Sequence, residues 1–387
     1  MCIRWLLPLA VFIADVVVPI DSFTSPFSGK INDANPRLES DCFHLHERPA
    51  TAVAAATPIR EEIRYIAGRR ATLLHPASKQ SDDCPPLIIL GGMAQSIASW
   101  EFHLPHFAKH RSVLIYECLG QGPLPPEEVC SRVDLDSYYD DVSLQQQGRD
   151  FWNVVEEAFF TPGSYYYDNY IVDESDRTNQ KVDVVGFSFG GRVAMAAAVS
   201  QPNRIRRFHL TGVGAEREEY ANVLLASWKE MLGDSDTDIV NEKHEMNNPK
   251  LRAFAWSIIL ATYSEPFLAS VGAARVLTWV DGVCKLNTQS GLRAILLQTH
   301  GGGGQWTPAS MAEHVKEGVE SCKLVVGSKD KMASPEQVLR LAQLLAKEES
   351  NEDDSYKVIE DCGHAVPFEA MRLWREDVIK YLTQRGT

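Results

Sequence analysis

The 387-residue sequence lacks several features that mark particular classes of protein. Its eight cysteines form no Cys-x-x-Cys pair, which argues against a structural zinc site and against a dense disulfide framework. No Asn-x-Ser/Thr acceptor for N-glycosylation occurs, which disfavours a glycosylated secreted product. We therefore expect the cysteines to be free thiols. The number of cysteines does not by itself indicate the cell compartment.

Basic residues are scarce relative to acidic ones. There are 38 Lys and Arg against 52 Asp and Glu, giving a formal net charge of -14. A surface of that sign repels phosphate backbones and anionic lipid, so nucleic acid is not an expected partner. The hydrophobic share of 44% and the charged share of 23% are ordinary for soluble domains, which excludes collagen-like, coiled-coil and mostly disordered chains.

An apolar run of signal-peptide length lies near the N-terminus. It follows Arg4, extends over residues 5–14 and is interrupted by Asp15. A membrane-spanning helix needs about 20 apolar residues, so a signal or targeting segment is favoured over a single-pass anchor. Membrane contact is expected only through this segment. We expect residues 1–60 to be a leader and linker that direct the chain to the secretory route or to an organelle such as a plastid.

After the leader, short apolar runs alternate with helical patterns, which is typical of an α/β fold with a mostly parallel sheet and helices on both faces. Residues 63–67 and 70–74 suggest an opening hairpin. The runs at 87–90 and 113–116 are compact and each is followed by glycine, as buried parallel strands are.

The most informative segment is Gly186-Phe187-Ser188-Phe189-Gly190, which follows an apolar strand and leads into a strong helix. This is the context of a nucleophile elbow, in which serine sits on a sharp strand-to-helix turn. Only glycine at 186 and 190 would let the strand and helix backbones pass closely. We therefore predict that Ser188 is a nucleophile.

A serine of ordinary acidity needs a base and an orienting carboxylate, which follow in the order Ser, Asp or Glu, His. Asp330 ends an apolar strand, and His364 follows the next one. Glu360 and Asp361 compete for the carboxylate role, but they immediately precede the histidine. The acidic loop at 348–354 lacks the spacing of a calcium loop, so no metal is expected.

Tetrahedral intermediates need two backbone N–H donors. The predicted donors are the N–H of Phe189, after the nucleophile, and that of Met93, in the glycine turn after strand 87–90. The His300-Gly301-Gly302-Gly303-Gly304 stretch looks like an oxyanion motif but follows the elbow. We interpret it as a flexible return from an insertion.

Together these motifs resemble the α/β-hydrolase superfamily over residue 63 to the C-terminus. The match is carried by Gly91-Gly92-Met93, the turn at 117–122, the elbow, and the Asp330 and His364 turns. The family usually has His-Gly at 91–92 and Asp at 117. The resemblance implies an α/β-hydrolase fold, with Ser188 as nucleophile, His364 as base and then acid, and Asp330 as its orienting group.

An excursion between 215 and 308 is mostly helical, with helices expected at 220–232, 251–263, 273–286 and 291–300. In this superfamily such an insertion resembles the cap that shapes the substrate pocket, which Trp256, Trp279 or Trp306 could line. The predicted division is a leader at 1–60, a first core part at 61–214, a cap at 215–310 and a second core part at 311–387.

The predicted function is hydrolysis of a carboxylic ester or thioester of a small or medium acyl substrate, without a cofactor. One alternative is a C–C lyase that resembles the menaquinone-pathway synthase, in which Arg192 would contact a substrate anion. Another is a ligand receptor that uses the same fold without catalysis. The sequence leaves the substrate and the oligomeric state open.

Overall fold

Eight strands form one sheet in the computed structural model, which describes residues 60–76, 84–125, 139–171, 180–233, 248–300, 306–347 and 355–384. Residues 1–59 of the expected leader, the acidic loop at 348–354 and the glycines at 301–304 lie outside these residues, whereas Arg60 begins β1. The strand order is β1-β2-β4-β3-β5-β6-β7-β8. The strands are β1 (Arg60–Ile66), β2 (Arg69–His75), β3 (Leu87–Leu90), β4 (Val113–Tyr116), β5 (Val182–Phe187), β6 (Ile205–Thr211), β7 (Val319–Gly327) and β8 (Tyr356–Ile359).

The sheet is antiparallel only at its first edge. Strand β1 pairs antiparallel with β2, and β2 with β4, whereas every later pair is parallel. The expected opening hairpin and mostly parallel sheet are therefore confirmed. Parallel pairing places the carboxyl ends of β3, β5, β6 and β7 along one edge, where the loops after them meet.

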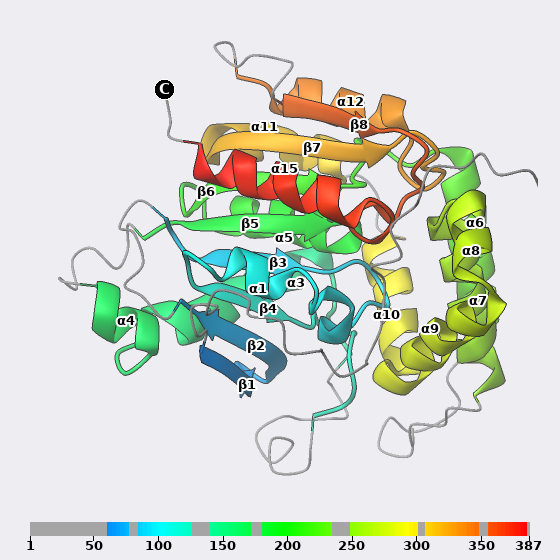
Figure 1. Cartoon of the computed structure of the whole chain (residues 1–387), viewed down its shortest axis with the longest axis horizontal. Helices are drawn as coiled ribbons and strands as arrows, with labels where there is room; N and C mark the ends of the chain where they lie inside the picture. Colours follow the sequence, from blue (N-terminus) through cyan, green and yellow to red (C-terminus); the bar gives the residue numbers. More distant parts are fainter. Residues whose placement is uncertain are drawn as a thin grey trace, which may run out of the picture. The chain divides into compact units, whose positions relative to one another are not determined.

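Helices cover both faces of the sheet, because alternate residues of the central strands point to opposite sides. Ile88 and Leu90 pack in one apolar core, while Leu87 and Ile89 pack in the other. In Figure 1, α15 and α1 cross the front face of the sheet, and α3, α5 and α11 cover its rear face. The helices of the core also include α12 and the short helices α4 and α14. Their bounds are α1 (Leu104–Phe107), α3 (Leu144–Val155), α4 (Tyr165–Tyr170), α5 (Phe189–Ser200), α11 (Pro308–Gly318), α12 (Pro335–Leu345), α14 (Val366–Glu369) and α15 (Met371–Thr383).

Within the described residues, five helices lie between β6 and α11. They are α6 (Glu219–Leu232), α7 (Pro249–Thr262), α8 (Glu265–Val271), α9 (Ala273–Leu286) and α10 (Gln289–His300). Four match the expected helices, and α8 is additional. Figure 1 shows α6 to α9 grouped beside the sheet, at the end toward which the parallel strands point. This is the edge where the loops that carry the site residues lie.

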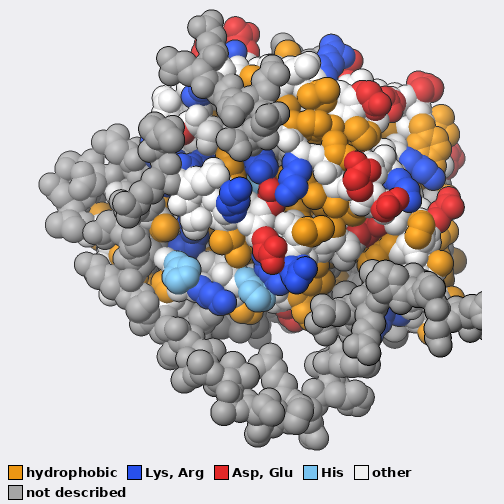
Figure 2. Space-filling model, turned by 45° about the horizontal axis from the view of Figure 1, so that its top comes forward, with side chains coloured by type: hydrophobic (Ala, Val, Ile, Leu, Met, Phe, Trp, Pro, Cys, Tyr) orange, Lys and Arg blue, Asp and Glu red, His pale blue; other side chains and the backbone are white. Residues whose placement is uncertain are grey.

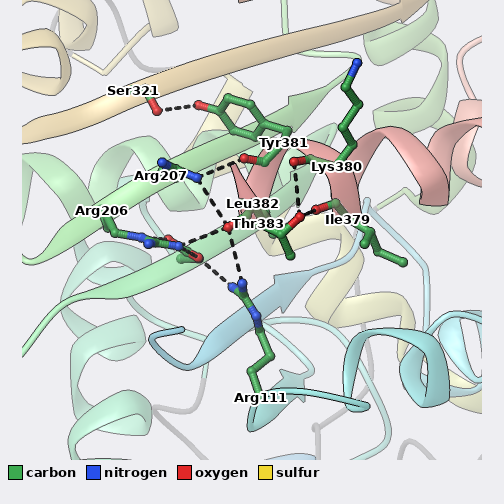
Figure 3. Close-up of polar contacts among 10 residues, drawn as sticks. Arg111, Arg206, Arg207, Ser321, Ile379, Lys380, Tyr381, Leu382 and Thr383 are labelled. Atoms are coloured by element: carbon green, nitrogen blue, oxygen red, sulfur yellow. Dashed lines mark hydrogen bonds and ion pairs between the residues drawn. The ribbon is translucent and has the colours of Figure 1, made fainter. Parts of the chain in front are cut away.

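A cluster of arginines anchors the C-terminal end of α15 to the sheet (Figure 3). The carbonyl of Leu382 accepts hydrogen bonds from Arg111, Arg206 and Arg207 at 3.1–3.3 Å. Asp183, fully buried in β5, pairs with Arg111 at 2.6 Å and with Arg206 at 2.5 Å. The guanidinium groups thus compensate both the buried carboxylate and the partial negative charge of the helix end.

Charges of both signs share the surface. Figure 2 shows a face on which Lys and Arg side chains lie among Asp, Glu and apolar side chains, so the net negative charge is not a uniform acidic field there. Within the described ranges no single helix is long and apolar enough to cross a membrane; α8 and α9 meet the criteria only as a pair, bent by 100°. The five cysteines in those ranges are free thiols.

We expect His103 to make the fold less stable in acid. The side chain is fully buried, and its Nε2 lies 3.0 Å from the carbonyl oxygen of Pro367. Burial lowers its pKa to about 3 from 6.5. As the pH falls below 6.5, the unfolded chain takes up the proton before the folded chain does. The free energy of unfolding should therefore fall by up to about 1.4 kcal/mol per pH unit from this group.

Denaturant titrations between pH 7 and pH 4.5 measure this dependence. In the His103→Gln variant the slope should be shallower by that amount, since glutamine can donate to the same carbonyl without titrating. Parallel curves for the two proteins would show that His103 does not control acid stability.

Candidate active site

Ser188 occupies a strained turn between β5 and α5. The strand is buried along its whole length and ends at Phe187, and the helix begins at Phe189. Ser188 has φ +51° and ψ -116°, a conformation that costs an ordinary residue free energy and persists where the surroundings impose it. Its N–H donates to the carbonyl of Thr211 in β6 at 2.8 Å. The turn therefore holds the serine at the carboxyl edge of the sheet.

The elbow needs glycine at 186 and 190 because other parts of the backbone contact it at both positions. A Cβ at Gly186 would lie 2.6 Å from Cα of Gly191, and a Cβ at Gly190 would lie 2.4 Å from the carbonyl oxygen of Leu90. Both distances are too short for any side chain. The close approach also brings the start of α5 against the end of β3, and hence next to the turn that carries Met93.

The structure brings the three predicted residues into one hydrogen-bonded chain. Nε2 of His364 lies 2.8 Å from Oγ of Ser188, and its Nδ1 lies 2.7 Å from Oδ2 of Asp330. Asp330 and His364 are buried, whereas Ser188 is half-buried. The geometry is that of a nucleophile, a base and an orienting carboxylate in series.

The carboxylate of Asp330 is fixed by its own turn. Its Oδ1 accepts from the N–H groups of Met332 at 2.8 Å and Ala333 at 2.9 Å, which leaves Oδ2 for the histidine. The competing Asp361 is 87% exposed and pairs with Lys329 at 2.8 Å. The pairing of His364 with Asp330, rather than with its near neighbours in sequence, follows from the adjacent parallel strands β7 and β8.

The histidine loop packs against its neighbours through glycine. A Cβ at Gly327 would lie 2.1 Å from the carbonyl oxygen of Gly363, and a Cβ at Gly212 would lie 2.8 Å from Cε1 of His364. The ring of Phe187 lies 5.2 Å from the imidazole, centre to centre. These contacts therefore hold the imidazole in the orientation that places its Nε2 next to Oγ of Ser188.

The two predicted oxyanion donors lie at the ends of neighbouring strands. Neither the N–H of Met93 nor that of Phe189 has an acceptor among the residues that the structure describes. Gln95 orders the turn: its side-chain oxygen accepts from the N–H of Gly92 at 2.8 Å and from Nε1 of Trp100 at 3.2 Å. A Cβ at Gly92 would meet the Phe187 ring at 2.9 Å. The turn is thus ordered by these contacts, and the N–H of Met93 stays available to a ligand oxygen.

Arg192 lies in the first turn of α5, and its Nη2 donates to the carbonyl of Thr299 in α10 at 3.0 Å. The side chain therefore joins the elbow helix α5 to α10. A contact between Arg192 and a substrate anion stays a prediction. Of the three tryptophans proposed for the pocket, Trp279 stacks on Tyr263 at 5.2 Å.

Glu369 is a structural residue of the site that the sequence analysis missed. One carboxylate oxygen accepts from the N–H of Gly363 at 3.1 Å and from that of Ser264 at 3.0 Å, and the other accepts from Oγ of Ser264 at 2.5 Å. It therefore ties the loop before His364 to the junction of α7 and α8. Its position five residues after the histidine is the only signal for it in the sequence.

We expect Glu369→Ala to lower the free energy of unfolding by about 2–4 kcal/mol, because two N–H groups and a hydroxyl lose a charged acceptor. Glu369→Gln keeps an acceptor oxygen and should lose about half as much. Urea titration measures both values. Equal stability of the alanine variant and the parent protein would mean that water replaces the carboxylate.

Comparisons with known proteins agree with this architecture. Residues 87–375 match the model of the "Alpha/beta hydrolase family". A 2-hydroxymuconate semialdehyde hydrolase from Pseudomonas sp. (strain CF600) is 25% identical over 272 residues, which cover 67% of this chain and 85% of that protein.

Solved structures show the same fold at lower identity. The enol-lactonase from Burkholderia xenovorans LB400 superposes with a TM-score of 0.55 at 15% identity, covering 84% of this chain and 100% of that one. A carboxylesterase from Bacillus subtilis gives 0.53 at 14% identity, covering 85% and 93%. With a family match over most of its length and an eight-stranded sheet of this order, the chain belongs to the alpha/beta hydrolase family.

Proposed function

We propose that the chain is a serine hydrolase that cleaves a carboxylic ester or thioester of a small or medium acyl substrate. The observation that carries the proposal is the series of contacts from Ser188 through His364 to Asp330, at 2.8 and 2.7 Å. The uncommitted N–H groups beside Ser188 support it, since acyl transfer needs donors at that place.

In the proposed acylation, Oγ of Ser188 bonds to the substrate carbonyl carbon while its proton moves to Nε2 of His364. The carbonyl π electrons move to the oxygen, and the N–H groups of Phe189 and Met93 donate to this oxyanion. When the carbonyl re-forms, the bond to the leaving group breaks. The alcohol or thiol departs with the proton from His364, which leaves an acyl-serine.

Deacylation repeats the sequence with water. His364 accepts a proton from water as the water oxygen bonds to the acyl carbon, and it then returns that proton to Oγ of Ser188 as the acid leaves. Asp330 stays ionised throughout: it accepts from Nδ1 of His364 and stabilises the imidazolium that forms in each half-reaction.

Hydrolysis of a carbon–carbon bond is a second candidate, and one observation favours it. The relative that shares 25% identity over 85% of its own length is named a 2-hydroxymuconate semialdehyde hydrolase. The same three residues could serve such a reaction, in which the departing group must take its proton on carbon. The two candidates differ in the bond that is cleaved and therefore in the substrates that react.

Labelling of the full chain by a fluorophosphonate probe tests the nucleophile, and a substrate panel tests the bond. The label should map to the peptide that contains Ser188. The panel should include esters and thioesters of short to long acyl chains together with 2-hydroxymuconate semialdehyde. Turnover confined to the semialdehyde would select the carbon–carbon candidate. Labelling at another residue, or tight ligand binding with no turnover of any compound, would refute the hydrolase proposal.

A further inference from the structure

Four consecutive polar residues are buried where α9 ends and α10 begins, the last two being the first residues of α10. Asn287, Thr288, Gln289 and Ser290 are exposed by 2%, 3%, 8% and 9% respectively. Polar side chains are mostly exposed in proteins, and those that are buried are nearly always hydrogen-bonded. This buried turn, residues 287–290, is therefore fixed by particular partners. Those of Gln289 lie at the end of α6 and the start of α7, whereas Asn287 and Thr288 also reach loops of the core.

Asn287 makes the most far-reaching contacts of the buried turn. Its Nδ2 donates to the carbonyl of Ala94 at 3.2 Å and to that of Val283 in α9 at 3.1 Å. Its Oδ1 accepts from the N–H of Gly122 at 3.3 Å. One amide thus joins α9 to two loops of the core, those that follow β3 and β4.

The contact with Ala94 falls inside the turn that carries the proposed oxyanion donor. Ala94 has φ +63°, which is unfavourable for a residue other than glycine and has to be imposed by its surroundings. The carbonyl of Gly92 accepts from the N–H of Gln95 at 3.2 Å. Because that carbonyl and the N–H of Met93 share one planar peptide, holding the one orients the other.

The turn around Met93 is therefore held at two places. Gln95 fixes the peptide before Met93 from within the core, and Asn287 fixes the carbonyl of the residue after it from α9. Loss of the second restraint would let Ala94 relax from its positive φ and would rotate the neighbouring peptide. The N–H of Met93 would then lose its direction toward the oxyanion.

The rest of the buried turn holds Asn287 in place. Oγ1 of Thr288 lies 2.8 Å from the hydroxyl of Tyr139, and a Cβ at Gly291 would lie 2.5 Å from the carbonyl oxygen of Gly120. The start of α10 is thus pressed on the same loop that Asn287 contacts through Gly122. The amide cannot move away without breaking these contacts as well.

We propose that Asn287 is a positioning residue that couples the helices after β6 to the oxyanion-hole turn, an inference that rests on the proposed serine hydrolase function. It acts through Ala94 on the N–H of Met93 and does not touch the reacting atoms. Its removal should weaken stabilisation of the transition state while leaving ground-state binding almost unchanged.

The test compares Asn287→Ala with Gln298→Ala in the full chain. Gln298 is a matched control: its amide makes three bonds from α10 to the core, to Tyr139, Asp140 and Val142, where that of Asn287 makes two, and none of the three reaches the oxyanion-hole turn. The kcat per fluorophosphonate-titrated serine should fall about 10- to 100-fold in Asn287→Ala, with KM within about 3-fold. Binding of a trifluoromethyl ketone analogue should weaken by the same factor as kcat/KM. In Gln298→Ala both constants should stay within about 3-fold of the parent.

A second variant keeps the inference falsifiable if alanine impairs folding. Asn287→Asp can still accept from Gly122 but cannot donate to Ala94, so its kcat should fall as in the alanine variant. Parental kcat in Asn287→Asp, or equal losses in Asn287→Ala and Gln298→Ala, would overturn this inference about Asn287. Either result would leave the proposed hydrolase function untouched. A parent protein that is neither labelled nor active on any ester or thioester would instead refute the proposed function, and the inference with it.

Discussion

Ser188→Ala should abolish fluorophosphonate labelling and lower kcat by about 10⁶-fold, the loss expected when the nucleophile of such a triad is removed. His364 and Asp330, the proposed base and its orienting group, would remain in place but would have no hydroxyl to activate. Alanine lacks only Oγ, and the N–H of residue 188 can still donate to the carbonyl of Thr211. The turn should therefore keep its shape, so the loss will report on chemistry rather than on folding.

Ser200→Ala provides the matched control, because Ser200 ends the same helix and its Oγ bonds only to the carbonyl of Ala196 within the described residues, at 2.9 Å. This variant should keep parental labelling and turnover. Burst kinetics with a chromogenic ester and mass mapping of the label measure both effects. Continued labelling of Ser188→Ala, or equal losses in the two variants, would remove Ser188 from the mechanism.

Much of the site could be predicted from local patterns. The G-x-S-x-G segment stands between an apolar strand and a helix. Gly186 fits an approach to Gly191 within the same segment, whereas Gly190 approaches Leu90 in β3. Asp330 and His364 follow successive strands, and parallel neighbouring strands bring their carboxyl ends together. Compact apolar runs and the order of the motifs were sufficient for these predictions.

The contacts that hold the site could not be predicted in the same way. Glu369 meets Ser264 across 105 positions, and Asn287 meets Ala94 across 193. Such pairs have no spacing rule, because they depend on how the helices after β6 dock on the core.

Asp330→Asn should lower kcat by about 10⁴-fold while the protein stays folded, and the surrounding hydrogen bonds explain why. Two backbone N–H groups, of Met332 and Ala333, point at Oδ1 of Asp330 and require an acceptor there. The oxygen of an asparagine amide will therefore take that place, and its NH₂ will face His364. Nδ1 of the histidine must then accept rather than donate.

That exchange reverses the role of the imidazole toward the nucleophile. With Nδ1 unprotonated, the neutral ring carries its proton on Nε2, which lies 2.8 Å from Oγ of Ser188. The ring then donates to the serine and cannot take its proton. Asp361→Asn is the control, because that carboxylate is exposed and pairs with Lys329; it should leave kcat unchanged. If Asp330→Asn kept more than about a tenth of the parental kcat, the tautomer argument would fail and another group would have to orient His364.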